Sequence, residues 1–180
     1  MQRRGSDEEN KDTTMNIMSI LIPEERIGVI NKKVRDVLSK KFGVEINIEG
    51  NEVKISGNTV DILKVRDIIL AIGRGFSPEH AYALENDDYM IDIINLSSFS
   101  PNRQKVIRSR VIGRGGKIRS AIEDATKCYV SVYGKTISII GNWKDVKNAR
   151  KIIEMLINGA EHTTILKILR DIKKERELNG

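Results

Sequence analysis

The chain has 180 residues, of which 39% are hydrophobic and 31% charged. This is the composition of a soluble globular protein that holds one ordinary domain or two small ones. The 31 Lys and Arg residues exceed the 25 Asp and Glu residues, which gives a net charge of +6 and a pI near 9.4. The excess is modest, so the places where basic residues cluster matter more than the total.

Cysteine content and apolar runs exclude several classes of protein. The single cysteine, Cys128, excludes an internal disulfide framework and a multi-cysteine zinc site. No apolar run approaches the roughly 20 residues of a membrane-spanning helix, and the N-terminus lacks the apolar segment of a signal peptide. Residues 1–14 are polar and charged, which predicts a flexible tail. We expect a cytoplasmic protein with no membrane partner.

Residues 15–86 predict a small α+β unit, because strand-like alternation and helical periodicity follow one another. The expected elements, in chain order, are a strand over 15–22, a short helix near Pro23, a turn over 27–31, a helix over 34–42, a hairpin over 44–55 and a helix from the cap Asn58 to Gly73. After Gly73, Ser77 is a plausible N-cap for a further helix that begins with Pro78.

An internal repeat organises the rest of the chain. A shift of 84 positions places Gly57-Asn58 on Gly141-Asn142 and Ile68-Ile69 on Ile152-Ile153. The second half, residues 87–180, is therefore expected to repeat the order strand, helix, turn, helix, strand, strand, helix. An amphipathic helix through Ile165 and Leu169 follows it.

The stretch from Val106 to Glu123 carries the strongest functional pattern. Its centre, Gly113-Arg114-Gly115-Gly116, can adopt positive φ angles and lie close to a ligand because glycine has no Cβ. The next residues start a helix, whose first backbone N–H groups favour phosphate. Seven basic residues and no acid lie between Arg103 and Arg119. The pattern predicts a polyanionic partner, against the alternative of a helix–turn–helix corner with a solvated basic face.

Aromatic residues near this stretch leave two interpretations open. Tyr129 and Tyr133 lie on one face of a predicted strand, where they can stack on nucleic-acid bases or cover either an interface between domains or the last helix. We favour a covering role, at the domain interface or under the last helix. Trp143 follows the helix cap Asn142 and is expected to be a packing residue, and Cys128 is expected to be a small buried hydrophobe.

The order of elements and the Ile112-Gly113-x-x-Gly116 loop resemble two tandem type I KH domains. The ordered chain, roughly Met15 to Lys174, is similar in particular to one KH family. This is the archaeal and eukaryotic "partner of Nob" family of dimethylase-interacting ribosome-assembly factors. The segments that carry the resemblance are Ile72 to Glu79 (IGRGFSPE), Asp87-Asp88-Tyr89, Arg110 to Arg119, Tyr129 to Gly134 (YVSVYG), Asn158-Gly159-Ala160 and His162-Thr163.

The resemblance implies an α+β fold in which each domain has a three-stranded sheet covered by three helices, with an extra C-terminal helix. KH domain 1 would span residues 15–86, with a degenerate glycine loop, and KH domain 2 residues 87–180, with an intact one. It also implies a protein without cofactor or metal that binds single-stranded RNA near the 3′ end of small-subunit rRNA, assists pre-rRNA processing and performs no chemistry. The implied protein partners are the Nob endonuclease and the α subunit of an archaeal translation initiation factor.

In a KH domain the glycine loop clamps the backbone of about four nucleotides, and the bases lie in a neighbouring groove. The RNA-binding residues that this implies are Arg110, Ile112, Gly113, Arg114, Gly115, Gly116, Lys117, Ile118, Arg119, Ile122 and Val130. Of these, Ile112, Ile118, Ile122 and Val130 can equally be core residues. In the first copy, Gly28-Val29-Ile30-Asn31 has no final glycine and follows Glu24 and Glu25, so we expect weak RNA binding or a protein contact there.

Two other functions are weighed against this one. A metal-dependent ribonuclease would use Asp87, Asp88 and Asp92, but such chemistry needs carboxylates that converge on a phosphate, and these lie far in sequence from the basic loop. A general single-stranded nucleic-acid-binding protein or translational regulator is the second alternative. Comparing the affinities for RNA and DNA oligonucleotides of the same sequence tests this alternative, because contacts to the 2′-OH distinguish RNA from DNA.

Overall fold

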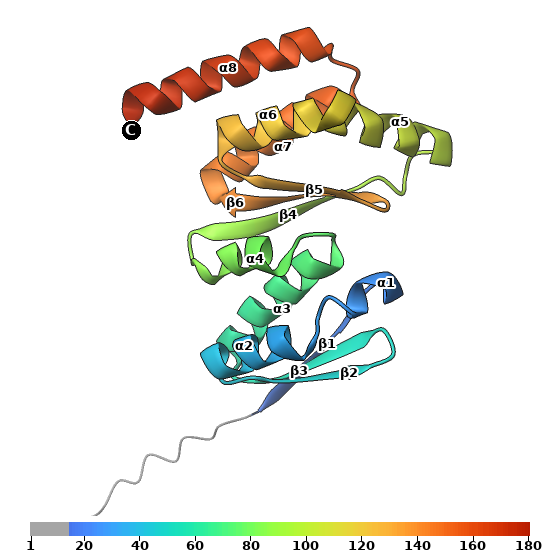
Figure 1. Ribbon diagram of the computed structural model, residues 1–180, viewed down its shortest axis with the longest axis vertical. Helices are drawn as coiled ribbons and strands as arrows, with labels where there is room; N and C mark the ends of the chain where they lie inside the picture. The colour runs from blue at the N-terminus through green and yellow to red at the C-terminus, as the bar shows by residue number, and fades with distance from the viewer. Residues whose placement is uncertain (1–14) are drawn as a thin grey trace, which may run out of the picture.

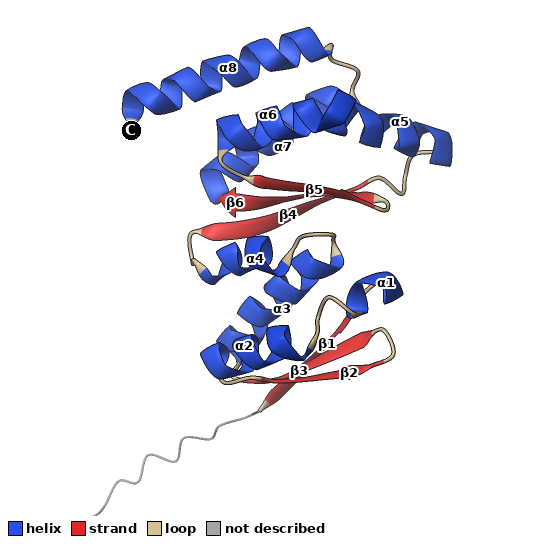
Figure 2. Ribbon diagram, in the orientation of Figure 1, coloured by secondary structure: helices blue, strands red, loops and turns tan. Residues whose placement is uncertain are grey.

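The computed structural model describes residues 15–180, which form two α+β units in succession along the chain (Figure 1). Residues 1–14, predicted to form a flexible tail, lie outside the described part. Each unit has one three-stranded antiparallel sheet with helices on one face (Figure 2). The predicted α+β class is therefore confirmed. Among residues 15–180, no helix is both long enough and apolar enough to cross a membrane.

In the first unit the strand order is β1-β3-β2. The strands are β1 (Asn16–Leu21), β2 (Glu45–Glu49) and β3 (Glu52–Gly57), and the helices are α1 (Glu24–Ile27), α2 (Lys32–Phe42) and α3 (Thr59–Gly73). Two short helical segments, α4 (Pro78–Ala81) and η1 (Tyr82–Glu85), lead into the second unit.

The second unit repeats this arrangement with strand order β4-β6-β5. Its strands are β4 (Tyr89–Asn95), β5 (Tyr129–Tyr133) and β6 (Thr136–Asn142), and its helices are α5 (Pro101–Ile112), η2 (Arg114–Gly116), α6 (Lys117–Thr126) and α7 (Trp143–Ile157). The additional helix α8 (His162–Asn179) lies over α6 and α7 (Figure 1). The greatest difference between the repeats is the helix before the glycine loop, which has four residues in the first unit and twelve in the second.

Side-chain caps start the helices where the sequence predicts them. The side chain of Asn58 accepts a hydrogen bond from the backbone N–H of Val60 at the start of α3, and Asn142 does the same for Lys144 at the start of α7. Ser77 caps α4 in the predicted way. These equivalent caps fix where the last helix of each unit begins and so preserve the register of the repeat.

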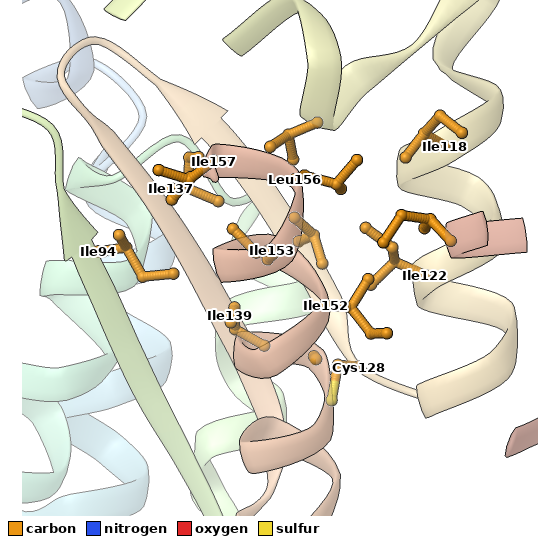
Figure 3. Packing of buried hydrophobic residues seen from close by; sticks show 14 of the residues in the cluster. Ile94, Ile118, Ile122, Cys128, Ile137, Ile139, Ile152, Ile153, Leu156 and Ile157 are labelled. Carbon is orange, nitrogen blue, oxygen red and sulfur yellow. The ribbon is translucent and has the colours of Figure 1, made fainter. Parts of the chain in front are cut away.

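Each unit buries its own apolar cluster between sheet and helices. In the first unit β3 supplies Val53 and Ile55, which are fully buried. In the second unit β6 supplies Ile137 and Ile139, which face the buried side of α7 (Figure 3). Cys128 belongs to this second cluster and is 2% exposed, as predicted. Burial raises the pKa of its thiol to about 11.

The outer face of the second sheet packs on the first unit. Ile140 of β6 is fully buried within the first unit's core cluster. The Ser131 hydroxyl donates a hydrogen bond of 2.8 Å to the carbonyl oxygen of Arg74, and the Tyr133 hydroxyl donates to the Glu25 carboxylate. The prediction that the tyrosine face of β5 covers an interface is thereby confirmed.

Trp143, expected to be a packing residue, is not buried. The indole is 47% exposed, and the ammonium groups of Lys144 and Lys147 lie 5.4 and 5.0 Å from its ring centroid. The residue occupies the first turn of α7, where the buried stripe begins only at Val146. Its side chain therefore covers helix surface between two lysines.

Candidate nucleic-acid interface

The glycine loop between α5 and α6 has a backbone that other residues rarely adopt. Gly113 has φ 72° and ψ 175°, Gly115 has φ 61° and ψ 23°, and Gly116 has φ 75° and ψ 14°. The first of these conformations is essentially restricted to glycine, and the other two are left-handed. Three positive φ angles in four residues interrupt the helical backbone between α5 and α6.

The loop glycines differ in how much space surrounds them. A Cβ at Gly113 would lie 2.5 Å from Cγ1 of Ile118 and 2.9 Å from its backbone nitrogen. At Gly115 and Gly116 a Cβ would meet nothing within 4 Å. Gly113 thus lets the loop close on α6, whereas Gly115 and Gly116 present bare backbone to solvent.

The start of α6 has no side-chain cap, because its N-cap residue is Gly116. The backbone N–H of Lys117 bonds the carbonyl oxygen of Arg114. No side chain caps the N–H groups that follow it, and the helix dipole favours negative charge there. In the first unit the equivalent helix α2 is capped by Asn31, whose side-chain oxygen accepts from the N–H of Val34 at 3.1 Å. Gly28 in that unit has an ordinary φ of −62°. The two loops thus differ in geometry as well as in sequence.

Arg114, Lys117 and Arg119 are exposed around the open loop. Within residues 15–180 none of the three forms an ion pair or a side-chain hydrogen bond. Unpaired cations beside an exposed glycine backbone and a helix start without a side-chain cap give this surface the chemistry of a phosphate site.

Arg110, by contrast, is used inside the protein. Its guanidinium donates to the carbonyl oxygen of Leu156 at 3.0 Å and also to that of Ala160. The Nε2 atom of His162 lies 3.1 Å from the Arg110 carbonyl oxygen, which can only accept, so this nitrogen carries the proton. Arg110 therefore connects α5 to the end of α7 and, through Ala160 and His162, to the start of α8.

Two further basic residues of the predicted run also bind main-chain carbonyls. Arg103 donates to Ile157 at 2.7 Å, and Arg108 donates to Gly134 at 3.1 Å. Three of the four basic residues on α5 thus bind main-chain carbonyls, whereas Lys105 and the three basic residues around the loop are exposed.

The apolar residues expected as a groove floor lie largely inside the core. Ile118, Ile122 and Val130 are 3%, 0% and 4% exposed and belong to the second core cluster, and Ile112 is half-buried. The side chains of Ile118 and Ile122 point from α6 toward Leu156 and Ile152 of α7 (Figure 3). Their role in this structure is to hold the loop, and little of their surface is left for a base.

Two of the three carboxylates that a nuclease would use, Asp87 and Asp92, are paired with cations. Asp87 accepts a 2.7 Å hydrogen bond from Lys64, which lowers the pKa of its carboxyl group, and Asp92 accepts from Arg150 at 2.8 Å. Within residues 15–180, no group of three or more His, Cys, Asp or Glu residues could hold a metal ion.

A three-stranded antiparallel sheet, three helices and a glycine loop between the first two helices define the second unit as a type I KH domain. The model for the second KH domain of PNO1 proteins, described as a eukaryotic-type KH domain (KH-domain type I), matches residues 90–174. A KH domain-containing protein of Methanocaldococcus jannaschii is 38% identical over 178 residues, which cover 93% of this chain and 76% of that protein.

Solved structures agree with this match over most of the chain. Dim2p from Pyrococcus horikoshii superposes with a TM-score of 0.80 at 37% identity, over 87% of this chain and 99% of that chain. The complex of a/eIF2alpha, aDim2p and rRNA from the same organism gives a TM-score of 0.84 at 36% identity, over 91% and 97%. A protein of unknown function from Aeropyrum pernix gives 0.83 at 27%, over 91% and 94%. The chain belongs to the Dim2/PNO1 family of KH-domain proteins.

Proposed function

We propose that this protein is an RNA-binding ribosome-assembly factor whose second unit, residues 87–180, clamps single-stranded RNA at the glycine loop. The observation that carries the proposal is the bare backbone of Gly115 and Gly116, which opens onto an uncapped helix start and three unpaired cations. A phosphate placed there receives hydrogen bonds from main-chain amides and attraction from Arg114, Lys117 and Arg119. The amides bind the sugar–phosphate chain and leave the bases free.

We propose that the first unit, residues 15–86, is a second KH domain of the tandem that has a different role. Asn31 already occupies one helix-start amide that a phosphate would need, that of Val34, and Glu24 and Glu25 add negative charge on the adjacent helix α1. Both features oppose an RNA clamp. We propose that this unit contacts a protein. Our candidate is the α subunit of an archaeal translation initiation factor, because a Pyrococcus relative forms a complex with a/eIF2alpha and rRNA.

The RNA that we propose is the 3′ region of small-subunit rRNA, where the protein would assist processing by the Nob endonuclease without cutting RNA itself. The rRNA in the complex of the Pyrococcus relative supports the class of RNA. The pairing of Asp87 and Asp92 with lysine and arginine supports a role in binding rather than in phosphoryl chemistry.

The test is a pair of variants at equivalent loops, compared in binding to a labelled single-stranded RNA from the rRNA 3′ end. The double variant Arg114→Asp, Gly115→Asp adds two negative charges where the structure has open space, so it should fold and lose RNA. The matched control, Gly28→Asp, adds a charge to the first loop and should bind almost as the unaltered protein does. Equal losses in both would refute the assignment of the clamp to the second unit.

A second experiment identifies the RNA that the protein binds in the cell. Crosslinking in cell extract followed by sequencing of the attached RNA should gather reads at the 3′ region of small-subunit rRNA. Reads scattered over messenger RNA would favour a general translational regulator instead.

A further inference from the structure

A groove between the two units has one wall from each unit and reaches α6 at Arg119, three residues after the glycine loop. One side consists of α6 and β5, with Arg119, Glu123 and Val132. The other side is the connection between α3 and α4 in the first unit, with Gly75, Ser77 and His80, and the groove encloses about 300 Å3. That is the lower end of the size range of ligand pockets. Arg119 links it to the loop that holds the phosphate in the proposed function.

A second hollow continues the groove beyond His80. It encloses about 770 Å3 and is lined by residues of η1, the start of β4 and the end of α6. His80 and Glu123 border both hollows, whereas Tyr129 borders only the larger one. The rings of His80 and Tyr129 stack with their centroids 3.9 Å apart and their planes 10° from parallel. This pair of rings stands at the passage from one hollow to the next.

The charges along the groove suit bases rather than phosphates. After Arg119, the next charged residue along α6 in the groove is Glu123, which forms no ion pair within residues 15–180. The larger hollow adds Glu85 and Asp124, whose charges are balanced by Lys41 and by Lys127 and Lys173. Carboxylates repel phosphate, but they accept hydrogen bonds from the amino groups of cytosine, adenine and guanine. The cations at the loop thus suit the phosphates of the RNA, and the carboxylate of Glu123 suits the amino group of a base.

Glu123 is held in position by a main-chain contact. Its Oε1 atom accepts a 2.9 Å hydrogen bond from the backbone N–H of Val130 on the edge strand β5. Within residues 15–180 its Oε2 atom has no hydrogen-bond partner, so one oriented acceptor remains in the groove. A fixed carboxylate discriminates between base edges better than a mobile one, because its orientation is set before the base arrives.

We propose that the groove is a base-recognition site shared by both units, in which a base of the clamped RNA stacks on His80 and donates an amino hydrogen to Glu123. The first unit thus contributes to RNA binding through the segment that joins its helices, although its own glycine loop is closed. The inference rests on the proposed function, because the loop must first hold the adjoining phosphate. Bases with an exocyclic amino group are preferred, and uracil, which has none, is disfavoured.

The experiment measures fluorescence anisotropy with labelled ten-nucleotide homopolymers of cytidine, adenosine and uridine. The unaltered protein should bind the cytidine polymer about fivefold more tightly than the uridine polymer, the low end for one hydrogen-bonded base edge. Glu123→Gln keeps an acceptor for Val130 but presents an amide to the base, so the two affinities should come within about twofold. A preference that persists in this variant would overturn the assignment of Glu123.

The stacking role of His80 is tested separately. His80→Ala should weaken binding of the cytidine polymer about fivefold, the low end for loss of one base–aromatic stack, with an unchanged salt dependence. His80→Phe should restore it. Trp143→Ala removes an exposed aromatic side chain outside both hollows and should have no effect.

The outcomes separate the two proposals. If the unaltered protein binds none of the polymers, the proposed clamp fails. If it binds them and the Arg114→Asp, Gly115→Asp variant does not, the clamp stands. In that case, binding like that of the unaltered protein by His80→Ala would overturn the shared groove alone.

Discussion

Substituting Gly113 by alanine tests how the glycine loop is held against α6. The new Cβ would lie 2.5 Å from the Ile118 side chain and 2.9 Å from the Ile118 backbone nitrogen, so neighbouring atoms must shift. Overpacking of this kind costs about 1–3 kcal/mol. The φ of 72° with ψ of 175° is strained for alanine and adds about 1–3 kcal/mol. Alanine also lowers the conformational entropy of the unfolded chain, which offsets part of this cost. The free energy of unfolding should therefore fall by about 2–5 kcal/mol.

Two other loop glycines serve as matched controls. Gly115→Ala has open space and a left-handed backbone, so its cost should be about 1 kcal/mol. Gly28→Ala, at the equivalent place in the first unit, has φ −62° and open space and should be neutral or stabilising by up to about 1 kcal/mol.

The assay is urea unfolding followed by the fluorescence of Trp143, the single tryptophan, which lies in the second unit. A difference of less than about 0.5 kcal/mol between Gly113→Ala and Gly115→Ala would refute the reasoning, because ordinary surface substitutions vary by that much.

Three further predictions follow from the site and the interface. Lys117→Gln and Arg119→Gln should each reduce the slope of log affinity for single-stranded RNA against log salt by about 0.7, and an unchanged slope would contradict a phosphate contact. Cys128, with its buried thiol and pKa of about 11, should react slowly with a thiol reagent at pH 8 in the folded protein and fast in urea, so fast reaction of the native protein would contradict its burial. The hydrogen bond from Tyr133 lowers the pKa of Glu25 below the usual 4.5, so it stabilises the fold above that pH and is lost as the pH falls through the lowered pKa. The stability difference between the unaltered protein and Tyr133→Phe should therefore shrink between pH 7 and pH 3, and a constant difference would argue against this contact.

Much of the fold follows from local patterns in the sequence. The alternation over residues 44–55 and the caps Asn58 and Asn142 are local features, and the repeat doubles their information, so two similar units were predictable. The glycine loop was predictable for the same reason, because the need for positive φ is a property of the loop itself.

Contacts between distant segments were not predictable in the same way. Arg110 looks like part of a free basic run, but it binds carbonyl oxygens of Leu156 and Ala160, at the far end of the unit in sequence. The stacking of His80 on Tyr129 depends on how the second sheet packs on the first unit. Periodicity shows which residues are apolar and which face they share, but it does not reveal which carbonyl or ring a distant side chain will meet. The IGRGFSPE segment was the one available signal for that wall of the groove.

The most direct measurement of the central claim follows the backbone amides themselves. In ¹H–¹⁵N spectra recorded during titration with single-stranded RNA, the amides of residues 113–119 should shift strongly, because the phosphate would bind at those N–H groups. The amides of residues 28–34, where Asn31 caps the helix, should stay in place. Large shifts at residues 28–34 with none at residues 113–119 would contradict the account.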